Sequence, residues 1–189
     1  LGTDHTEYYV TPNEAREVIP RLPEMYDEPF SDSSQIPTFL VSQLARQHVT
    51  VALSGDGGDE LFGGYNRYFH LRNRWRQVNR IPCRKIVSKI LSIPGKLSRG
   101  RWRDRFLYRA ALLGMNSAGS LYQNANLHWQ PDSDLVLNSK DVASTYWNQD
   151  GWLKSENPIE EWMWLDSETY LPDDILTKVD RASMAVSLE

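Results

Sequence analysis

Apolar residues recur at helical spacing in the first part of the chain. The sequence Thr-Pro-Asn-Glu at positions 11–14 combines a capping threonine, an early proline and a glutamate three residues on, which is typical of a helix start. Ala15, Val18 and Leu22 then share one face of that helix. We expect this helix to end before Pro23.

Three further helices are predicted from the same kind of spacing. One begins near positions 31–32 and places an apolar residue at every fourth position from Ile36 to Leu44. Another begins at Pro158. The sequence Pro-Asp-Asp at 172–174 starts the third, whose apolar face carries Ile175, Val179, Ala182 and Val186. Between them, from about Met115 to Asp150, the chain is polar and predicts short helices and loops.

Two short runs have the character of β-strands. Residues 7–10 predict a short strand, and residues 49–53 form an apolar, β-branched run that predicts a strand buried on both faces. Because a helix precedes this second run, the order of elements favours a parallel α/β unit. The predicted fold is therefore a helix-rich α/β domain with a short parallel sheet and many helices.

Composition narrows the class of protein further. The 189 residues are 40% hydrophobic and 24% charged, which is typical of a globular domain, so residues 1–189 are treated as one domain or part of one. No apolar run approaches the roughly 20 residues of a membrane span. The single Cys83 excludes an internal disulfide framework. We expect a soluble, cytoplasmic protein without a membrane partner.

The formal charge of −4 is unevenly distributed. Residues 67–109 carry 14 Lys and Arg but one acid, Asp104. Such a basic segment can bind nucleic acid or an anionic surface, or it can be a set of exposed helical faces. Pro82, Pro94 and Gly95 are expected to divide it into two or three short helices. Its interleaved apolar residues are expected to be core anchors: Trp75, Ile81, Ile86, Ile90, Trp102 and Phe106.

A glycine-rich loop follows the second predicted strand. Residues 54–65 read Ser-Gly-Asp-Gly-Gly-Asp-Glu-Leu-Phe-Gly-Gly-Tyr and lead into a helix. Ligands of parallel α/β sheets bind beyond the carboxyl ends of the strands, which is where this loop lies. Gly55, Gly57 and Gly58 permit a sharp turn and close approach of the backbone to phosphate oxygens.

Two acids in the same loop change that interpretation. Asp56 and Asp59 would repel phosphate unless a cation lay between them, which favours Mg²⁺ bridging carboxylate and phosphate in a nucleotide site. The alternative is an ordinary turn in which Asp59 and Glu60 stabilise a helix N-terminus. The loop lacks the lysine of a Walker motif and the spacing of an EF-hand.

Residues 51–65 resemble the signature of the synthetase domain of glutamine-hydrolysing asparagine synthetases. Three further segments resemble the same family in the same order: residues 1–7, the stretch Tyr-Asp-Glu-Pro-Phe-Ser-Asp-Ser-Ser-Gln-Ile-Pro-Thr at 26–38, and residues 170–189 around Asp-Arg-Ala-Ser-Met. The resemblance spans nearly the whole chain and is weakest from about 69 to 160.

The resemblance implies part of a two-domain enzyme with a synthetase domain of the ATP-pyrophosphatase type. In that family ATP and Mg²⁺ activate the side-chain carboxylate of aspartate as β-aspartyl-AMP. Ammonia, released from glutamine by an N-terminal glutaminase domain, then attacks it to give asparagine, AMP and pyrophosphate. A homodimer of the longer protein is a further expectation, and nucleic acid is not expected as a partner.

The resemblance also implies roles for residues of the loop. Asp59 corresponds to the family's Mg²⁺ ligand, and Asp56 to an acid near the acyl-adenylate. Ser54 and Gly55 correspond to positions that approach AMP. The following glycines, Gly57 and Gly58, are assigned to the same nucleotide site.

On the last helix, Arg181 corresponds to the family's cation facing pyrophosphate. Lys178, three residues before it, could reach the same region. For both residues an ordinary surface or ion-pair role is the alternative.

The family's Ser-Gly-Gly-x-Asp-Ser loop, which binds pyrophosphate, does not occur in residues 1–189. We therefore expect an internal fragment of the synthetase domain, inactive by itself. Two alternatives stay open. The longer protein could amidate another carboxylate, as relatives in polysaccharide or antibiotic biosynthesis do. Alternatively, residues 67–109 could make this an anionic-polymer-binding module.

Overall fold

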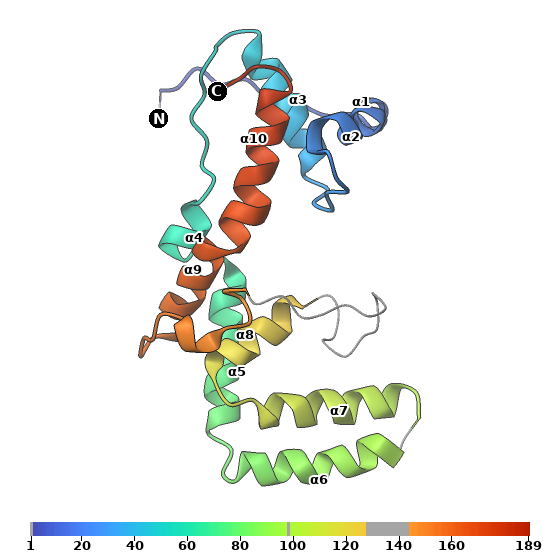
Figure 1. Cartoon of the computed structure of the whole chain (residues 1–189), viewed down its shortest axis with the longest axis vertical. Coiled ribbons are helices and arrows are strands. Elements are labelled where there is room, and N and C mark those ends of the chain that lie inside the picture. Colours follow the sequence, from blue (N-terminus) through green and yellow to red (C-terminus); the bar gives the residue numbers. More distant parts are fainter. Residues whose placement is uncertain (1, 98, 128–143) are drawn as a thin grey trace. The chain divides into compact units, whose positions relative to one another are not determined.

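The computed structural model describes residues 2–97, 99–127 and 144–189, and helices dominate it (Figure 1). The chain forms two compact units. Unit 1 comprises residues 1–57 and 169–189, and unit 2 comprises residues 58–168. No helix in the described ranges has both the length and the apolar character needed to cross a membrane.

Unit 1 is a cluster of helices built from both ends of the chain. Its helices are α1 (Pro12–Val18), α2 (Leu22–Tyr26), α3 (Gln35–Arg46) and α10 (Thr177–Met184), with a 3₁₀ turn η1 (Ile19–Arg21) and a π-helical segment η3 (Leu171–Leu176). Helix α10 packs along α3 (Figure 1). The buried core of this unit consists of Val18, Met25, Tyr26, Phe39, Leu40 and Ala182.

The first predicted helix start is confirmed. The Thr11 hydroxyl accepts a hydrogen bond from the Glu14 amide at 3.3 Å, and the Glu14 carboxylate accepts one from the Thr11 amide at 2.8 Å. The predicted end is wrong, because the chain tightens into η1 and then re-forms α2 with Pro23 inside its first turn. Proline is tolerated there since the first-turn N–H groups have no partner within the helix.

Unit 2 contains the remaining helices. They are α4 (Gly58–Phe62), α5 (Asn66–Asn79), α6 (Arg84–Leu97), α7 (Arg101–Gly114), α8 (Ala118–Asn126) and α9 (Pro158–Glu168), with a 3₁₀ turn η2 (Gln149–Gly151). Its core lies where α5, α8 and α9 meet and is rich in aromatic residues. The Tyr122 and Trp162 rings stack there with their centroids 5.2 Å apart. The predicted start of α9 at Pro158 is confirmed.

The basic segment forms three helices of 14 residues each. Pro82 lies between the first and second of these helices, and Gly100 lies between the second and third. The predicted break at Pro94 and Gly95 is wrong, because both residues lie inside α6. Gly95 allows α7 to approach closely: a Cβ on Gly95 would lie 2.8 Å from Cδ2 of Leu107. Packing against α7 therefore holds α6 continuous through a sequence that disfavours a helix.

Most of the expected core anchors of this segment are not in the core. Trp75 and Phe106 are half-buried, and Trp75 packs against the core of unit 2. The other four are exposed, namely Ile81, Ile86, Ile90 and Trp102. Spacing alone does not determine which face of a helix is buried. Helix α6 packs against α7 through a different face from the one that carries Ile86 and Ile90.

The predicted strands are absent from the described residues. Residues 7–10 lie outside any regular element, and residues 49–53 are exposed instead of buried, with Leu53 fully accessible. A strand is buried on both faces only where other elements cover both of those faces, and residues 49–53 lack such cover in the described part of the chain. The stretch from about 115 to 150, predicted to contain short helices and loops, contains α8 and η2, and its residues 128–143 lie outside the described residues.

Candidate functional site

The segment that leads into the signature loop makes one pairing of sheet type. The Glu189 amide donates to the Thr50 carbonyl at 2.9 Å, and the Ala52 amide donates to the Glu189 carbonyl at 2.6 Å. Two bonds that flank Val51 in this way are the pattern of parallel strands. The short parallel sheet itself stays a prediction, with Val51 and Glu189 as its one pairing in the described part of unit 1.

The first half of the loop belongs to unit 1 and is open to solvent. Ser54, Gly55 and Asp56 are exposed. Gly57 is buried and has a φ of +85°, a backbone conformation that residues with a Cβ rarely adopt. The turn between the two aspartates therefore requires glycine at position 57.

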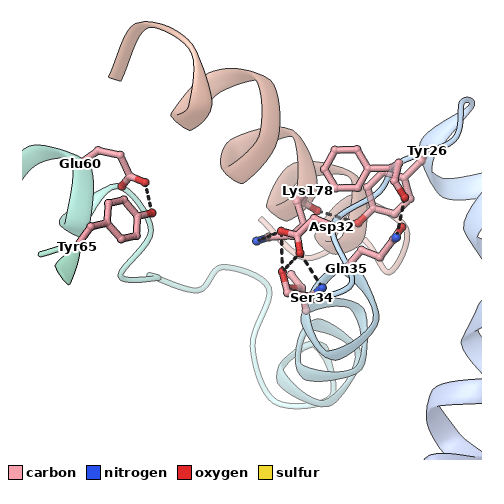
Figure 2. Close-up of polar contacts among 9 residues, drawn as sticks. Tyr26, Asp32, Ser34, Gln35, Glu60, Tyr65 and Lys178 are labelled. Carbon is pink, nitrogen blue, oxygen red and sulfur yellow. Dashed lines mark hydrogen bonds and ion pairs between the residues drawn. The ribbon is translucent and has the colours of Figure 1, made fainter. Parts of the chain in front are cut away.

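The second half of the loop belongs to unit 2 and forms the short helix α4. Asp59 lies in its first turn with an exposed side chain, whereas its neighbour Glu60 is 1% exposed. The Glu60 carboxylate accepts a hydrogen bond from the Tyr65 hydroxyl at 2.5 Å (Figure 2). Two adjacent acids thus differ in role: Glu60 is tied into the structure, and Asp59 faces solvent.

Two glycines after α4 bring the chain back against Asp59. The Gly64 amide donates to the Asp59 carbonyl at 3.0 Å, and a Cβ on Gly64 would collide with the Asp59 carboxylate. Gly63 has a φ of +69°, and a Cβ there would lie 3.3 Å from Sδ of Met163 on α9. The Gly-Gly pair therefore fixes the return of the chain and leaves room for the Asp59 side chain.

Asp56 and Asp59 share one further property. Within the described ranges neither carboxylate takes part in a hydrogen bond or an ion pair. Carboxylates without protein partners are available to a cation or a ligand. This sets them apart from Glu60 and from the acids described next.

Lys178, one of the predicted site residues, is buried in unit 1 and bound to an acid. Its ammonium donates to Oδ2 of Asp32 at 2.8 Å, and the Ser34 amide and hydroxyl donate to the same carboxylate (Figure 2). The Tyr26 hydroxyl donates to the Lys178 carbonyl at 3.1 Å. The sequence analysis did not single out Asp32, although it lies in the stretch 26–38 that carries the resemblance.

Electrostatics at this pair favour the ionised acid. Burial alone would raise the pKa of Asp32, but hydrogen bonds from Lys178 and Ser34 outweigh burial and lower that pKa. Nearby Asp174 behaves in the opposite way, because burial and the charge of Asp32 raise its pKa.

Arg181, the other predicted cation, lies in a different environment. Its guanidinium donates to the carboxylate of Asp27 at 3.1 Å, and both side chains are exposed. An exposed pair of this kind is weak and can exchange for another anion. Lys178 and Arg181 therefore differ in their surroundings: Lys178 is buried with Asp32, and Arg181 is accessible.

Unit 2 contains a buried polar cluster that the sequence analysis did not find. Oδ2 of Asp166 accepts hydrogen bonds from Arg67 at 2.6 Å, from the Tyr68 hydroxyl at 2.6 Å and from the Tyr122 hydroxyl at 2.5 Å. Burial, followed by the hydrogen bond to Asp166 and the charge of Asp166, raises the pKa of both tyrosines. The cluster joins α5, α8 and α9, and α4 packs against α9. It thereby supports the helix that carries Asp59.

The donor chemistry of the loop fits magnesium better than a metal held wholly by protein. The described residues contain no group of three or more His, Cys, Asp or Glu side chains placed to hold a metal ion. Mg²⁺ is usually bound by one or two carboxylates together with waters and substrate phosphates. The accessible Asp59 carboxylate suits such a site, with Asp56 three residues before it in the sequence.

Comparison with known proteins agrees with the motifs. The model of the asparagine synthase family matches residues 1–189. A glutamine-hydrolysing asparagine synthetase of Bacillus subtilis is 30% identical over 200 residues, which cover 100% of this chain and 30% of that protein. Relatives of the same name from Arabidopsis thaliana and Oryza sativa are 37% and 40% identical over 46% of the chain and 15% of their own lengths.

No solved structure matches the chain. The chain spans about a third or less of the length of the curated relatives it matches, 30% for the protein from Bacillus subtilis. A match along all 189 residues to the family nevertheless shows the membership. The chain belongs to the asparagine synthase family.

Proposed function

We propose that this chain is part of the synthetase domain of a glutamine-dependent asparagine synthetase, a ligase that converts ATP to AMP and pyrophosphate. The observation that carries the proposal is the pair of accessible loop acids, Asp56 and Asp59, which have no hydrogen bond or ion pair among the described residues, in a chain that belongs to the family throughout its length. The substrates of the longer protein would be aspartate, ATP and ammonia from glutamine.

The chemistry requires activation of a poor electrophile. A carboxylate resists attack by ammonia until its oxygen is bonded to AMP, so the carboxylate of aspartate must first displace pyrophosphate from ATP. Asp59 would hold Mg²⁺, and bound Mg²⁺ would offset negative charge on the phosphates. Asp56 would orient ammonia or accept its proton.

The remaining loop residues would bind the nucleotide. Exposed Ser54 and Gly55 would approach AMP through backbone and hydroxyl groups, and Gly57 and Gly58 would let the backbone turn there. Arg181, whose exposed ion pair with Asp27 can exchange, would meet the pyrophosphate.

Lys178 has a weaker case for direct contact with a ligand. Its ammonium is already bound to Asp32 and nine-tenths of its side chain is buried. We therefore propose for it a positioning role, holding α10 against the residues 26–38 that also carry the family resemblance.

A substrate panel on the full-length protein tests the function. We expect AMP and pyrophosphate to form only when aspartate is present, and asparagine to form when glutamine or ammonia is added. If another carboxylate supported AMP formation and aspartate did not, the protein would amidate that carboxylate instead. Residues 1–189 alone should give no AMP.

The second candidate, binding of an anionic polymer by residues 67–109, has one observation in its favour. Those residues carry 14 Lys and Arg but one acid. Retention of RNA or DNA at low salt, lost steeply as salt is added, would support it. The accessible acids of the loop favour the synthetase.

A further inference from the structure

Helix α6 packs against α7 through a face that is not its most apolar one. The Arg84 guanidinium donates to the Leu113 carbonyl at 2.9 Å, and the Ser88 hydroxyl donates to the Ala110 carbonyl at 2.6 Å. Gly95 lies against Leu107 at the far end of the same contact. Positions 84, 88 and 95 therefore lie on the inner face of α6, together with the half-buried Val87 and Leu91.

The opposite face of α6 is a stripe of aliphatic residues. It consists of Ile86, Ile90, Ile93 and Leu97, which are 58%, 59%, 59% and 80% exposed. Since each residue turns the helix by about 100°, positions two residues after 84 and 88 lie roughly 200° away from the inner face. An amphipathic helix normally turns such a stripe towards its core. Here the stripe points away from α7, the helix beside it in Figure 1.

Cations border this stripe. Lys85 and Lys89 are exposed and each lies one position, about 100°, from a stripe isoleucine. The hairpin from 84 to 114 has nine Lys and Arg and one acid. On α7, Trp102 is 62% exposed with the Arg105 guanidinium 5.2 Å above its ring. Aliphatic, aromatic and cationic side chains are thus all accessible on one helical hairpin.

These properties distinguish among the possible binding partners of the hairpin. A second copy of the hairpin would bring two strongly positive surfaces together. Nucleic acid would satisfy the cations, but aliphatic side chains offer it neither stacking nor hydrogen bonds. An anionic lipid surface satisfies both features, since headgroup phosphates attract Lys and Arg while the acyl boundary takes up the apolar stripe.

We propose that the α6–α7 hairpin binds the surface of an anionic membrane, with α6 lying in the plane of the interface and its isoleucine stripe facing the acyl chains. A helix that lies on a membrane needs no spanning segment. The proposal therefore departs from the expectation, drawn from the sequence, that this protein has no membrane partner. It does not depend on the reaction the protein catalyses.

Vesicle co-sedimentation of the full-length protein tests the proposal. We expect binding to vesicles that mix phosphatidylcholine with phosphatidylserine, weaker binding at high salt, and little binding to phosphatidylcholine alone. Ile90→Asp should lower the partition coefficient by about tenfold or more, and Lys89→Gln by about fivefold. Val41→Asp is the matched control, because Val41 is a 55% exposed aliphatic residue on α3 outside the hairpin, and it should bind like the parent.

Several results would overturn the proposal. These are absence of binding to the anionic vesicles, equal binding by Ile90→Asp and the parent, or an equal loss in Val41→Asp. Concentration-dependent dimerisation that Ile90→Asp abolishes, without vesicle binding, would assign the stripe to a second copy. Circular dichroism of each variant checks that helix content is unchanged, so that a loss of binding reports on the surface alone.

Discussion

The acids of the signature loop and the acid at the centre of unit 2 are opposite in their surroundings. Asp166 is buried and accepts hydrogen bonds from Arg67, Tyr68 and Tyr122. Asp56 and Asp59 are exposed and make no hydrogen bond or ion pair with the part of the chain that the structure describes. A buried charge must be fully partnered to be tolerated, whereas a charge that binds a ligand must be left available.

Position in the loop, not residue type, separates the two roles. Asp59 and Glu60 are neighbours on α4, yet Glu60 is buried against Tyr65 and Asp59 is not. Substitutions of partnered acids should therefore reduce stability, and substitutions of Asp59 should reduce activity with little effect on stability. The following experiments test that distinction and can contradict it.

Asp166→Ala should have the largest effect on stability. It removes the carboxylate that accepts hydrogen bonds from Arg67 and from two buried tyrosine hydroxyls, which should cost unit 2 about 3 kcal/mol. Hydrogen exchange of α8 and α9 in the full-length protein measures this locally. Asp150→Ala, an exposed acid in η2, is the control and should change protection by less than about 0.5 kcal/mol. Equal protection in the two variants would contradict the structural role of Asp166.

Lys178→Met should have a smaller effect, confined to unit 1. The substitution removes the cation from Asp32, whose side chain keeps 23% exposure and its bonds from Ser34, so about 2 kcal/mol should be lost. Exchange protection of α3 and α10 reports the loss. Arg181→Met, which removes an exposed ion pair on the same helix, should leave protection nearly unchanged. If Arg181→Met were as destabilising as Lys178→Met, the contrast between the two cations would be wrong.

Gly64→Ala tests how the loop holds Asp59. A Cβ at position 64 would displace the Asp59 carboxylate, so we expect about 1 kcal/mol of lost stability together with a clear loss of activity. Gly58→Ala is the comparison for stability, because a Cβ on Gly58 would meet open space. Normal activity in Gly64→Ala would show that the Asp59 side chain need not occupy its observed place.

The smallest expected effect is on the way the stability of unit 1 changes with pH. Because Lys178 and Ser34 lower the pKa of Asp32 in the folded state, Asp32 contributes stability that is present above its unfolded pKa of about 4 and is lost as pH falls below that value. The pKa of Asp174 is raised, so its ionisation opposes folding as pH rises. Acid titration of unit 1 by exchange should show a shallower loss in Asp32→Asn. A steeper loss would contradict this sign.

Local chemistry made much of unit 1 predictable. The capping box at Thr11 and Glu14 needs only nearby residues and is confirmed. The apolar face of the last helix is confirmed in part: Ala182 is in the core and Val186 packs against it, but Ile175 lies in η3 and Val186 lies beyond the end of α10. The end of α1 and the continuity of α6 depend on packing partners, so Pro23 and Pro94 misled the prediction. Burial of residues 49–53 depends on what lies beside them, which their own pattern does not contain.

Contacts between residues far apart in the sequence could not be predicted either. The motif identified Asp59 and Lys178 by position, but their surroundings depend on residues that no local pattern connects. Asp32 lies 146 residues from Lys178, and Asp166 lies 99 residues from Arg67. Distinguishing a buried, partnered charge from an accessible one therefore required the fold.

The central claim is that Asp59 holds Mg²⁺ during activation of aspartate. The most direct measurement is the Mg²⁺ dependence of aspartate-dependent pyrophosphate release by the full-length protein, compared between Asp59→Asn and the control Asp150→Asn. We expect Asp59→Asn to lower the rate by about 100-fold or more, to require more Mg²⁺ for half-maximal rate, and to keep parental exchange protection. Asp150→Asn should match the parent. A normal rate and unchanged Mg²⁺ dependence in Asp59→Asn would contradict the claim.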